Sequence, residues 1–203
     1  MIPVGLGSVR MSGHGFTIFD TAVGRCGIAW GDLGIIGVQL PEARELETRR
    51  RMYRIYPEAR EQRAPLNTEI AIEGIVALLR GGNASMADAV LDFSGMPHFN
   101  QRVYQYVRSI PRGETRTYED IANGMRVHGA VHSVAQALGR NPFMVIVPCH
   151  RVLEAGNYAD KMAPNSGVIS KRRLLTIEGA HPTVSKTLFE VLLPPVAPTR
   201  THN

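Results

Sequence analysis

The sequence predicts an α+β protein in which a small, mainly antiparallel sheet with helices is followed by a helical region. Two observations predict this fold. Short apolar runs separated by glycine turns fill residues 15–40, which is typical of strands joined by tight turns. After Gly95-Met96-Pro97, apolar residues recur at helical spacing instead. With 44% hydrophobic and 20% charged residues over 203 residues, the composition fits a globular chain with its own core and excludes a largely disordered one.

The N-terminal part is predicted to contain four strands. Residues 16–19, 26–30 and 34–40 are apolar runs, and the Gly-Arg and Gly-Asp pairs between them are turn signals. Residues 89–93 form another short apolar run and are expected to be a further strand.

Two helices are predicted between these strands. Residues 42–56 are rich in Arg and Glu and should form an exposed helix that ends before Pro57. Residues 65–79 carry apolar residues at the i, i+3, i+4 and i+7 positions of a helix, which Gly81-Gly82 closes.

The C-terminal part is predicted to contain a helix pair. A helix over 99–107 is followed by one over 118–123, for which Thr117 is the expected N-cap, and by one over 130–138. Two helices joined by a short turn resemble a helix-turn-helix, whose second helix enters a DNA groove. Residues 145–147 are expected to be a short buried strand or an extended segment.

The basic charge is concentrated in one region. Lys and Arg number 23 against 18 Asp and Glu, a net charge of +5. Residues 101–180 hold 11 Lys and Arg against 6 Asp and Glu, so they carry the whole excess. A localised basic excess suits a polyanion such as nucleic acid, and a solvated surface face is the alternative on charge alone.

The sequence also limits location and cofactors. No apolar run approaches the roughly 20 residues that span a bilayer, so no membrane association is expected. Residues 1–15 lack an apolar stretch with a cleavage site, which predicts a cytoplasmic protein with free thiols. The two cysteines, Cys26 and Cys149, are too few for a disulfide framework or a cysteine-based zinc site, so we expect no metal and no cofactor.

Cys149 is the candidate nucleophile. It follows an apolar run and precedes His150 and Arg151, whose side chains can lower the pKa of a neighbouring thiol. Most single cysteines are inert buried residues, so adjacency in sequence alone leaves both readings open.

The segment IVPCHRV, residues 146–152, resembles the active-site motif of the O6-alkylguanine-DNA alkyltransferases, also called methylated-DNA–protein-cysteine methyltransferases. The resemblance covers roughly residues 95–180. Its other parts are FNQRVY at 99–104, IPRGE at 110–114, Thr117-Tyr118, Ile121-Ala122, Asn141-Pro142, Lys171, Leu174-Leu175 and Glu178-Gly179.

The resemblance implies a division into domains. An RNase H-like domain would cover 16–94, and a winged helix-turn-helix-like domain that binds DNA and carries the active-site cysteine would cover 95–182. Residues 1–15 would be a flexible N-terminus, and residues 183–203 an extension whose Pro-rich tail is expected to be disordered.

The implied activity is direct reversal of DNA damage. The protein would flip an alkylated base out of duplex DNA and move the alkyl group, such as methyl, irreversibly and once from O6 of guanine or O4 of thymine to Cys149. His150, acting through a water, would be the base, Glu178 would orient the imidazole, and Tyr118 would protonate guanine N3. Double-stranded DNA carrying O6-alkylguanine is the expected partner of a monomer.

The resemblance implies further roles around the site. Asn141 would couple the DNA-binding helix to the cysteine segment, the main-chain carbonyls of Cys149 and Val152 would accept from the guanine amino group, and Arg151 would form a structural salt bridge. The expected DNA-binding residues are Thr117, Arg126, His132, Ser133, Ala135 and Arg140.

Two positions depart from the family pattern. His132 stands where the family has an arginine that fills the gap left by the flipped base, and a histidine is shorter and mostly neutral at pH 7. Arg126, His128 or Arg140 could compensate, so we hypothesise weaker lesion searching or an altered flipping mode. In the slightly longer loop 153–170, Asn165, Ser166 and Gly167 fall at the small-residue positions of the alkyl pocket, and Pro164 or Met162 falls near the position of an aromatic lining residue. Tyr158 is the alternative lining residue, which leaves the lesion size preference open.

Two other functions compete with this one. A non-catalytic lesion-binding protein would lack the cysteine, which this chain keeps. A helix-turn-helix transcription regulator would need a second half-site, usually through dimerisation, and no dimerisation helix is evident.

Overall fold

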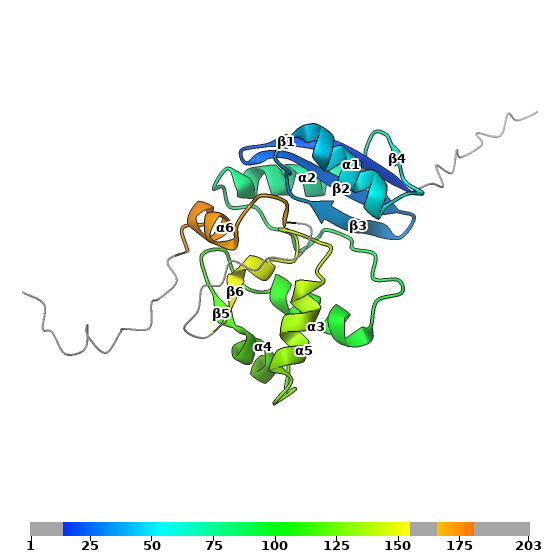
Figure 1. Ribbon diagram of the computed structural model, residues 1–203. Helices are drawn as coiled ribbons and strands as arrows, with labels where there is room; N and C mark the ends of the chain where they lie inside the picture. Colours follow the sequence, from blue (N-terminus) through cyan, green and yellow to red (C-terminus); the bar gives the residue numbers. More distant parts are fainter. Residues whose placement is uncertain (1–13, 155–165, 181–203) are drawn as a thin grey trace, which may run out of the picture.

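The computed structural model describes residues 14–154 and 166–180. The expectations for residues 1–13 and 181–203 lie outside the described residues, as do those for Tyr158, Met162, Pro164 and Asn165. The described chain forms an N-terminal sheet with helices above a largely helical C-terminal part (Figure 1). No helix of the described residues is long and apolar enough to cross a membrane.

The sheet is a meander with one added strand. Strands β1 (Gly15–Thr21), β2 (Gly24–Gly31) and β3 (Gly34–Gln39) pair antiparallel, as the sequence predicts, and β4 (Arg60–Glu61) joins the other edge of β1 in parallel. The strand order is β3-β2-β1-β4. The β1–β2 turn places Gly24 at a φ of 126°, a conformation that favours glycine.

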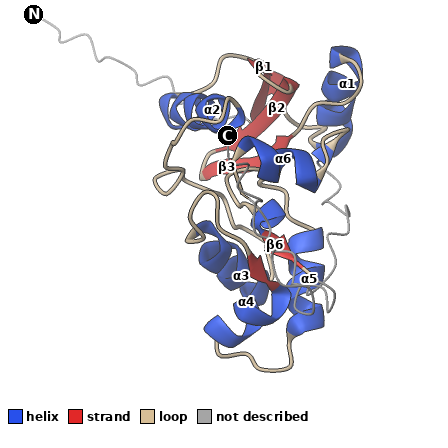
Figure 2. Ribbon diagram, turned by 90° about the vertical axis from the view of Figure 1, so that its left-hand side faces the viewer, coloured by secondary structure: helices blue, strands red, loops and turns tan. Residues whose placement is uncertain are grey.

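The two predicted N-terminal helices cover opposite faces of the sheet. Figure 2 shows the strands between α1 (Glu45–Ile55) and α2 (Leu66–Leu79). Neighbouring residues of β2 point to opposite faces, as strand geometry requires: Ala29 packs with Met52 of α1, whereas Ile28 belongs to the main core with Ile75 of α2. This main core continues into the C-terminal part, so the sheet and the helices share one interior.

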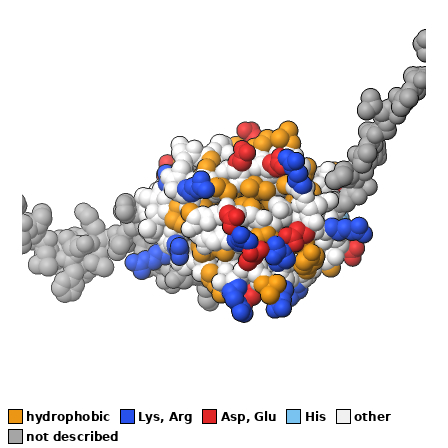
Figure 3. Space-filling model, turned by 90° about the horizontal axis from the view of Figure 1, so that it is seen from above, with side chains coloured by type: hydrophobic (Ala, Val, Ile, Leu, Met, Phe, Trp, Pro, Cys, Tyr) orange, Lys and Arg blue, Asp and Glu red, His pale blue; other side chains and the backbone are white. Residues whose placement is uncertain are grey.

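The outer face of α1 is charged, as its Arg- and Glu-rich sequence predicts. Arg49 binds Glu45 at 2.7 Å on the same helix and Glu61 of β4 at 2.9 Å. Seen from above, basic and acidic side chains are intermixed on this face (Figure 3). This surface therefore carries no single-sign patch for a polyanion.

The predicted strand at residues 89–93 is wrong. Only Leu91 forms an isolated bridge, with Ile35 of β3, and the flanking hydrogen bonds join the Ile35 backbone to Val90 and Asp92. Val90 is 51% exposed, because the chain meets the sheet at one point and then leaves it. The apolar run reflects this single contact.

The C-terminal helices match their predicted positions. Helix α3 (His98–Arg108) packs against α5 (Val131–Gly139), and α4 (Tyr118–Gly124) lies beside α5. Thr117 caps α4 as predicted: its hydroxyl accepts from the Asp120 N–H, and the Asp120 carboxylate accepts from the Thr117 N–H. The cap fixes where α4 begins.

Two short strands and a last helix complete the C-terminal part. Strand β5 (Arg116–Thr117) pairs in parallel with β6 (Val152–Leu153), which ties the start of α4 to the segment after Cys149. Helix α6 (Lys171–Ile177) packs against the 3₁₀ turn η1 (Cys149–Arg151) and against α2.

Candidate active site

Cys149 opens the 3₁₀ turn η1, and the chain before it is a compact turn rather than a strand. Met144 and Val147 form an isolated bridge, and Val145 between them has a φ of 70°. A β-branched residue rarely adopts this conformation, so the surrounding packing must hold it there. The predicted short strand or extended segment at 145–147 is therefore part of this turn.

Asn141 stabilises that turn from within. Its Nδ2 donates to the Val147 carbonyl at 3.0 Å, and its Oδ1 accepts from the Phe143 N–H at 2.9 Å. The side chain is buried, and it follows directly on α5 and its C-cap Arg140. Asn141 therefore links the end of α5 to the segment that leads into Cys149.

The Cys149 thiol is buried, with only 5% of the residue exposed. Burial raises the pKa of the Cys149 thiol, while a hydrogen bond from Asn141 and the charge of Lys171 act in the opposite direction. In the free protein the sulfur is thus held as a thiol. A nucleophilic thiolate requires removal of its proton when substrate arrives.

His150, Arg151 and Glu178 form a buried ionic cluster. The His150 Nε2 lies 2.8 Å from the Glu178 Oε1, and the Arg151 Nε and a terminal nitrogen donate to the two carboxylate oxygens at 2.8 and 2.7 Å. Arg151 also donates to the Ile110 carbonyl at 2.6 Å. Burial alone would raise the pKa of Glu178, but the hydrogen bonds from His150 and Arg151 lower this pKa to about 2. The carboxylate is therefore ionised.

The second ring nitrogen of His150 is a free acceptor. Burial lowers the pKa of His150, so the imidazole is neutral at pH 7. With its Nε2–H donating to Glu178, the Nδ1 carries a lone pair, and it has no hydrogen-bond partner within the described residues. A buried nitrogen of this kind can take up a proton, directly or through a water.

Tyr118 and Lys171 lie at the same site. Tyr118 is the first residue of α4, and burial followed by the charge of Cys149 raises the pKa of its hydroxyl, which therefore stays protonated. The Lys171 ammonium lies 5.7 Å from the centre of the Tyr118 ring and donates to the Val152 carbonyl at 2.5 Å. Lys171 is 5% exposed.

Lys171 is a residue of this site whose role the sequence did not predict. Lys171 and Leu174-Leu175 are part of the family resemblance, but only the fold brings α6 back against η1 and places Lys171 beside the Tyr118 ring. The signal that could have identified it is a lysine at the start of an apolar helix, where an ammonium must find a partner if it is buried.

The predicted DNA-binding residues lie on or near α4 and α5. Arg126 is in the connection between the helices, with a φ of 58°, and Arg140 follows α5. His132 and Ser133 are exposed in the first turn of α5, and Ala135 is half-buried one turn later. Exposed residues on one short helix are available to a partner, whereas Thr117 is engaged as the N-cap of α4.

The loop after the cysteine is described only in part. Ser166 is half-buried, and its carbonyl accepts from the Ile169 N–H. No group of three or more metal-binding side chains occurs within residues 14–154 and 166–180.

The chain is similar in sequence to known methylated-DNA–protein-cysteine methyltransferases. The model of the 6-O-methylguanine DNA methyltransferase DNA-binding domain matches residues 98–180. A methylated-DNA–protein-cysteine methyltransferase from Methanothermobacter thermautotrophicus is 34% identical over 75% of this chain and 78% of its own length. One from Mycobacterium bovis is 39% identical over 54% of this chain and 64% of its own length.

Solved structures agree with the sequence comparison. The crystal structure of the Mycobacterium tuberculosis O6-methylguanine methyltransferase has a TM-score of 0.62 and 27% identity, over 84% of this chain and 96% of that one. A structure of the same mycobacterial protein in complex with DNA has a TM-score of 0.60 and 27% identity, over 81% of this chain and 92% of that one.

Proposed function

The chain belongs to the methylated-DNA–protein-cysteine methyltransferase family, which performs direct-reversal DNA repair by alkyl transfer to a cysteine, and we propose that Cys149 is the acceptor. The observation that carries this assignment is the arrangement around Cys149. A buried thiol directly precedes a neutral histidine that is hydrogen-bonded to an ionised carboxylate. This is the order of groups that nucleophilic catalysis by a thiol requires.

The reaction begins with removal of the thiol proton. The lone pair on His150 Nδ1 accepts this proton through a water, and the Glu178 carboxylate stabilises the imidazolium that results. The negative charge of Glu178 also fixes the ring orientation, because its hydrogen bond holds the proton on Nε2. Arg151 is a positioning residue that holds Glu178 through two hydrogen bonds.

Alkyl transfer then follows at O6 of a flipped guanine. The sulfur forms a bond to the alkyl carbon while the carbon–O6 bond breaks, and that electron pair stays on the guanine. The Tyr118 hydroxyl donates a proton to guanine N3, and the imidazolium proton restores the tyrosine. Thiol and alkylguanine thus become thioether and guanine. The thioether is stable, so each molecule reacts once.

Recognition of the base uses main-chain groups. The Val152 carbonyl accepts from the guanine amino group, and Lys171 fixes its direction by donating to the same oxygen, which has two lone pairs. The Cys149 carbonyl is the second acceptor.

DNA is held by the face around the start of α5. His132 and Ser133 meet the minor groove, and Arg126 and Arg140 bind phosphates nearby. Affinity should fall steeply with salt because these contacts release counterions. The protein should discriminate little between undamaged sequences, since the minor groove carries a degenerate code.

Mass spectrometry tests the assignment. The protein is incubated with duplex DNA carrying O6-methylguanine, and the peptide that contains Cys149 should gain one methyl group while the Cys26 peptide stays unmodified. Cys149→Ser should bind the same DNA and leave it methylated. A methyl group on another residue, or repair by Cys149→Ser at the native rate, contradicts the assignment.

A further inference from the structure

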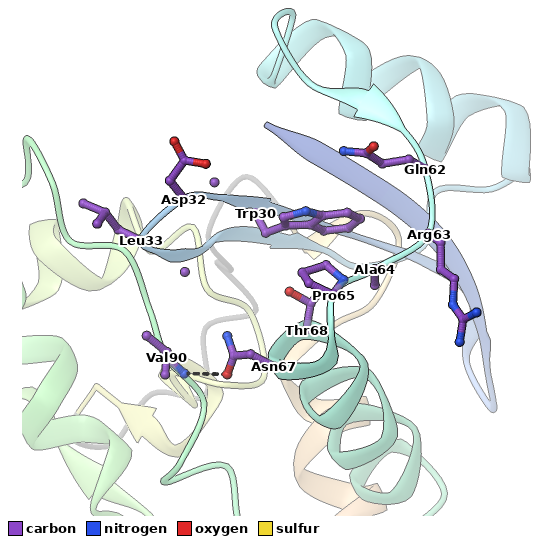
Figure 4. Close-up of a pocket in the computed structure, with 12 residues that line it drawn as sticks. Trp30, Asp32, Leu33, Gln62, Arg63, Ala64, Pro65, Asn67, Thr68 and Val90 are labelled. Atoms are coloured by element: carbon purple, nitrogen blue, oxygen red, sulfur yellow. Dashed lines mark hydrogen bonds between the residues drawn. The ribbon is translucent and has the colours of Figure 1, made fainter. Parts of the chain in front are cut away.

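A cavity of about 630 Å³ lies in the N-terminal part, where neither Cys149 nor its partners reach. It is bounded by the β2–β3 hairpin, the connection before α2 and the first turn of α2 (Figure 4). Trp30, Leu33, Pro65 and Val90 give it apolar walls. Cavities of this size and character commonly hold small molecules.

The first turn of α2 presents hydrogen-bond donors to this cavity. Pro65 is the N-cap and no side chain caps the helix. The Pro65 carbonyl accepts from the Thr68 and Glu69 N–H groups, so within the described residues the Leu66 and Asn67 N–H groups and the positive end of the helix dipole are left for another acceptor. The Val90 N–H donates to the Asn67 Oδ1 at 3.5 Å, which orients the amide so that its nitrogen points into the cavity (Figure 4).

Thr68 adds a second, independent feature. The residue is 1% exposed, yet its hydroxyl has no hydrogen-bond partner within the described residues. Its oxygen points into the cavity, on the side of α2 that faces Asn67 and the β2–β3 hairpin (Figure 4). A buried hydroxyl without a partner is unfavourable, so it indicates a missing acceptor or donor at this position.

The charges around the cavity define what can fill it. Arg63 points away from the cavity and binds Glu69 at 3.1 Å, so no cation of the lining faces inward (Figure 4). Asp32 lies on the opposite wall, exposed to solvent. Leu33 and Val90 at the opening are 65% and 51% exposed. Neutral donors at one end and exposed apolar side chains at the other suit a ligand with an acceptor head and an apolar body.

We propose that this cavity binds a small carboxylate with an apolar body. The carboxylate accepts hydrogen bonds from the Asn67 side-chain amide, the Thr68 hydroxyl and the Asn67 backbone N–H, as anions do at helix N-termini. The apolar body covers Leu33, Val90 and the edge of Trp30. The site is separate from the alkyl-transfer site and does not depend on the proposed repair function.

Phenylacetate is a suitable probe, and its binding can be followed by ¹H–¹⁵N NMR on the full chain. We expect saturable shifts in the amides of Trp30, Leu33, Asn67, Thr68 and Val90, with a Kd on the order of 1 mM, as ligands of this size allow. Phenylacetamide should bind more weakly and phenethylamine should not bind there. Absence of saturation below about 20 mM, or equal binding of all three compounds, overturns the proposal.

Two threonine variants distinguish a ligand site from a packing feature. Thr68→Val keeps the shape but removes the hydroxyl, and we expect phenylacetate to bind about five- to tenfold more weakly. Thr176→Val, which removes an exposed hydroxyl bonded to the Arg172 carbonyl on α6, should bind like the original protein. Unchanged binding by Thr68→Val overturns the proposal. Methyl transfer by both variants should be unaffected, which separates this test from that of the repair function.

Discussion

The His150 Nε2 and the Glu178 Oε1 lie 2.8 Å apart although 28 positions separate the residues in the chain. The same carboxylate also accepts hydrogen bonds from the Arg151 guanidinium, so one carboxylate holds two side chains of η1. All three residues are buried. The contact therefore joins the C-terminal end of α6 to the turn that carries Cys149, and it links stability to the protonation state of one carboxylate.

Glu178→Gln should destabilise the fold in a pH-dependent way. The pKa of Glu178 is lowered from 4.5 to about 2, so its contribution is complete above pH 4.5 and is lost as the pH falls through about 2. At pH 7 the loss should be on the order of 3 kcal/mol, because Arg151 is left buried without its counter-charge. Urea unfolding at pH 7 and at pH 3 measures this, and the difference between the two proteins should shrink at pH 3.

A matched control is Glu114→Gln, since Glu114 pairs with Arg116 at 2.7 Å on the exposed surface. Its effect should be below about 1 kcal/mol at either pH. An equal loss for Glu178→Gln at both pH values would show that its charge has no part in stability.

The Cys149 thiol should react slowly with iodoacetamide in the absence of DNA. Burial raises its pKa, so at pH 7 it should react more slowly than free cysteine, and the rate should still increase above pH 8. Methyl transfer should instead persist to a lower pH than an ordinary imidazole base would allow, because burial lowers the pKa of the His150 base. Peptide mass spectrometry gives the first rate and quenched transfer assays the second. Fast alkylation at pH 7 would mean that the free protein already holds a thiolate.

Asn141→Ala should destabilise the fold and slow transfer together. The substitution leaves the Phe143 N–H buried without a partner and removes one of the two hydrogen bonds to the Val147 carbonyl, which still accepts from the Cys149 N–H, and together this costs about 2–4 kcal/mol. Asn141→Asp keeps the acceptor for Phe143 and should retain part of the stability. Thermal unfolding and single-turnover transfer measure the two effects. If a destabilised Asn141→Ala variant transferred the methyl group at the native rate, Asn141 would stabilise the turn without contributing to the reaction.

Much of the fold could be predicted because its elements are local. The strands β1 to β3 alternate with glycine turns, and Thr117 and Asp120 are three residues apart in sequence, so the cap of α4 is visible there. Strand β4 has only two exposed residues and pairs with β1 from about 45 positions away. No periodicity can mark so short an element.

In the candidate site, too, some features could be predicted from the sequence and others depend on the fold. The motif around Cys149 and the roles of Asn141 and Arg151 follow from a resemblance in sequence. The contact of Lys171 with Val152 and Tyr118 depends on how α6, β6 and α4 meet, which no local pattern contains. The left-handed conformation of Val145 is likewise imposed by packing and could not be read from an apolar run.

Lys171→Met should slow methyl transfer while largely preserving the stability of the fold. The substitution keeps the apolar stem and removes the charge that lowers the Cys149 pKa and the hydrogen bond to Val152. We expect at least a tenfold slower transfer because the thiol is harder to ionise, and the loss of transfer at low pH should begin at a higher pH because the charge of Lys171 also lowers the pKa of His150. Lys171→Arg should recover part of the rate. An unchanged pH profile for Lys171→Met would limit Lys171 to packing.

His132→Arg should strengthen DNA binding and speed transfer. His132 is exposed in the first turn of α5, at the position where the family resemblance expects an arginine. A guanidinium reaches further than an imidazole, is always charged and can bind phosphate or an unpaired base through two hydrogen bonds. Affinity for methylated duplex should rise about three- to tenfold, with one further counterion released in the salt dependence.

His128→Arg is the matched control, because His128 is also exposed but contacts Asn123 before α5 begins. Equal gains from both variants would reflect added charge alone, whereas a gain in transfer rate only for His132→Arg would assign residue 132 to base flipping.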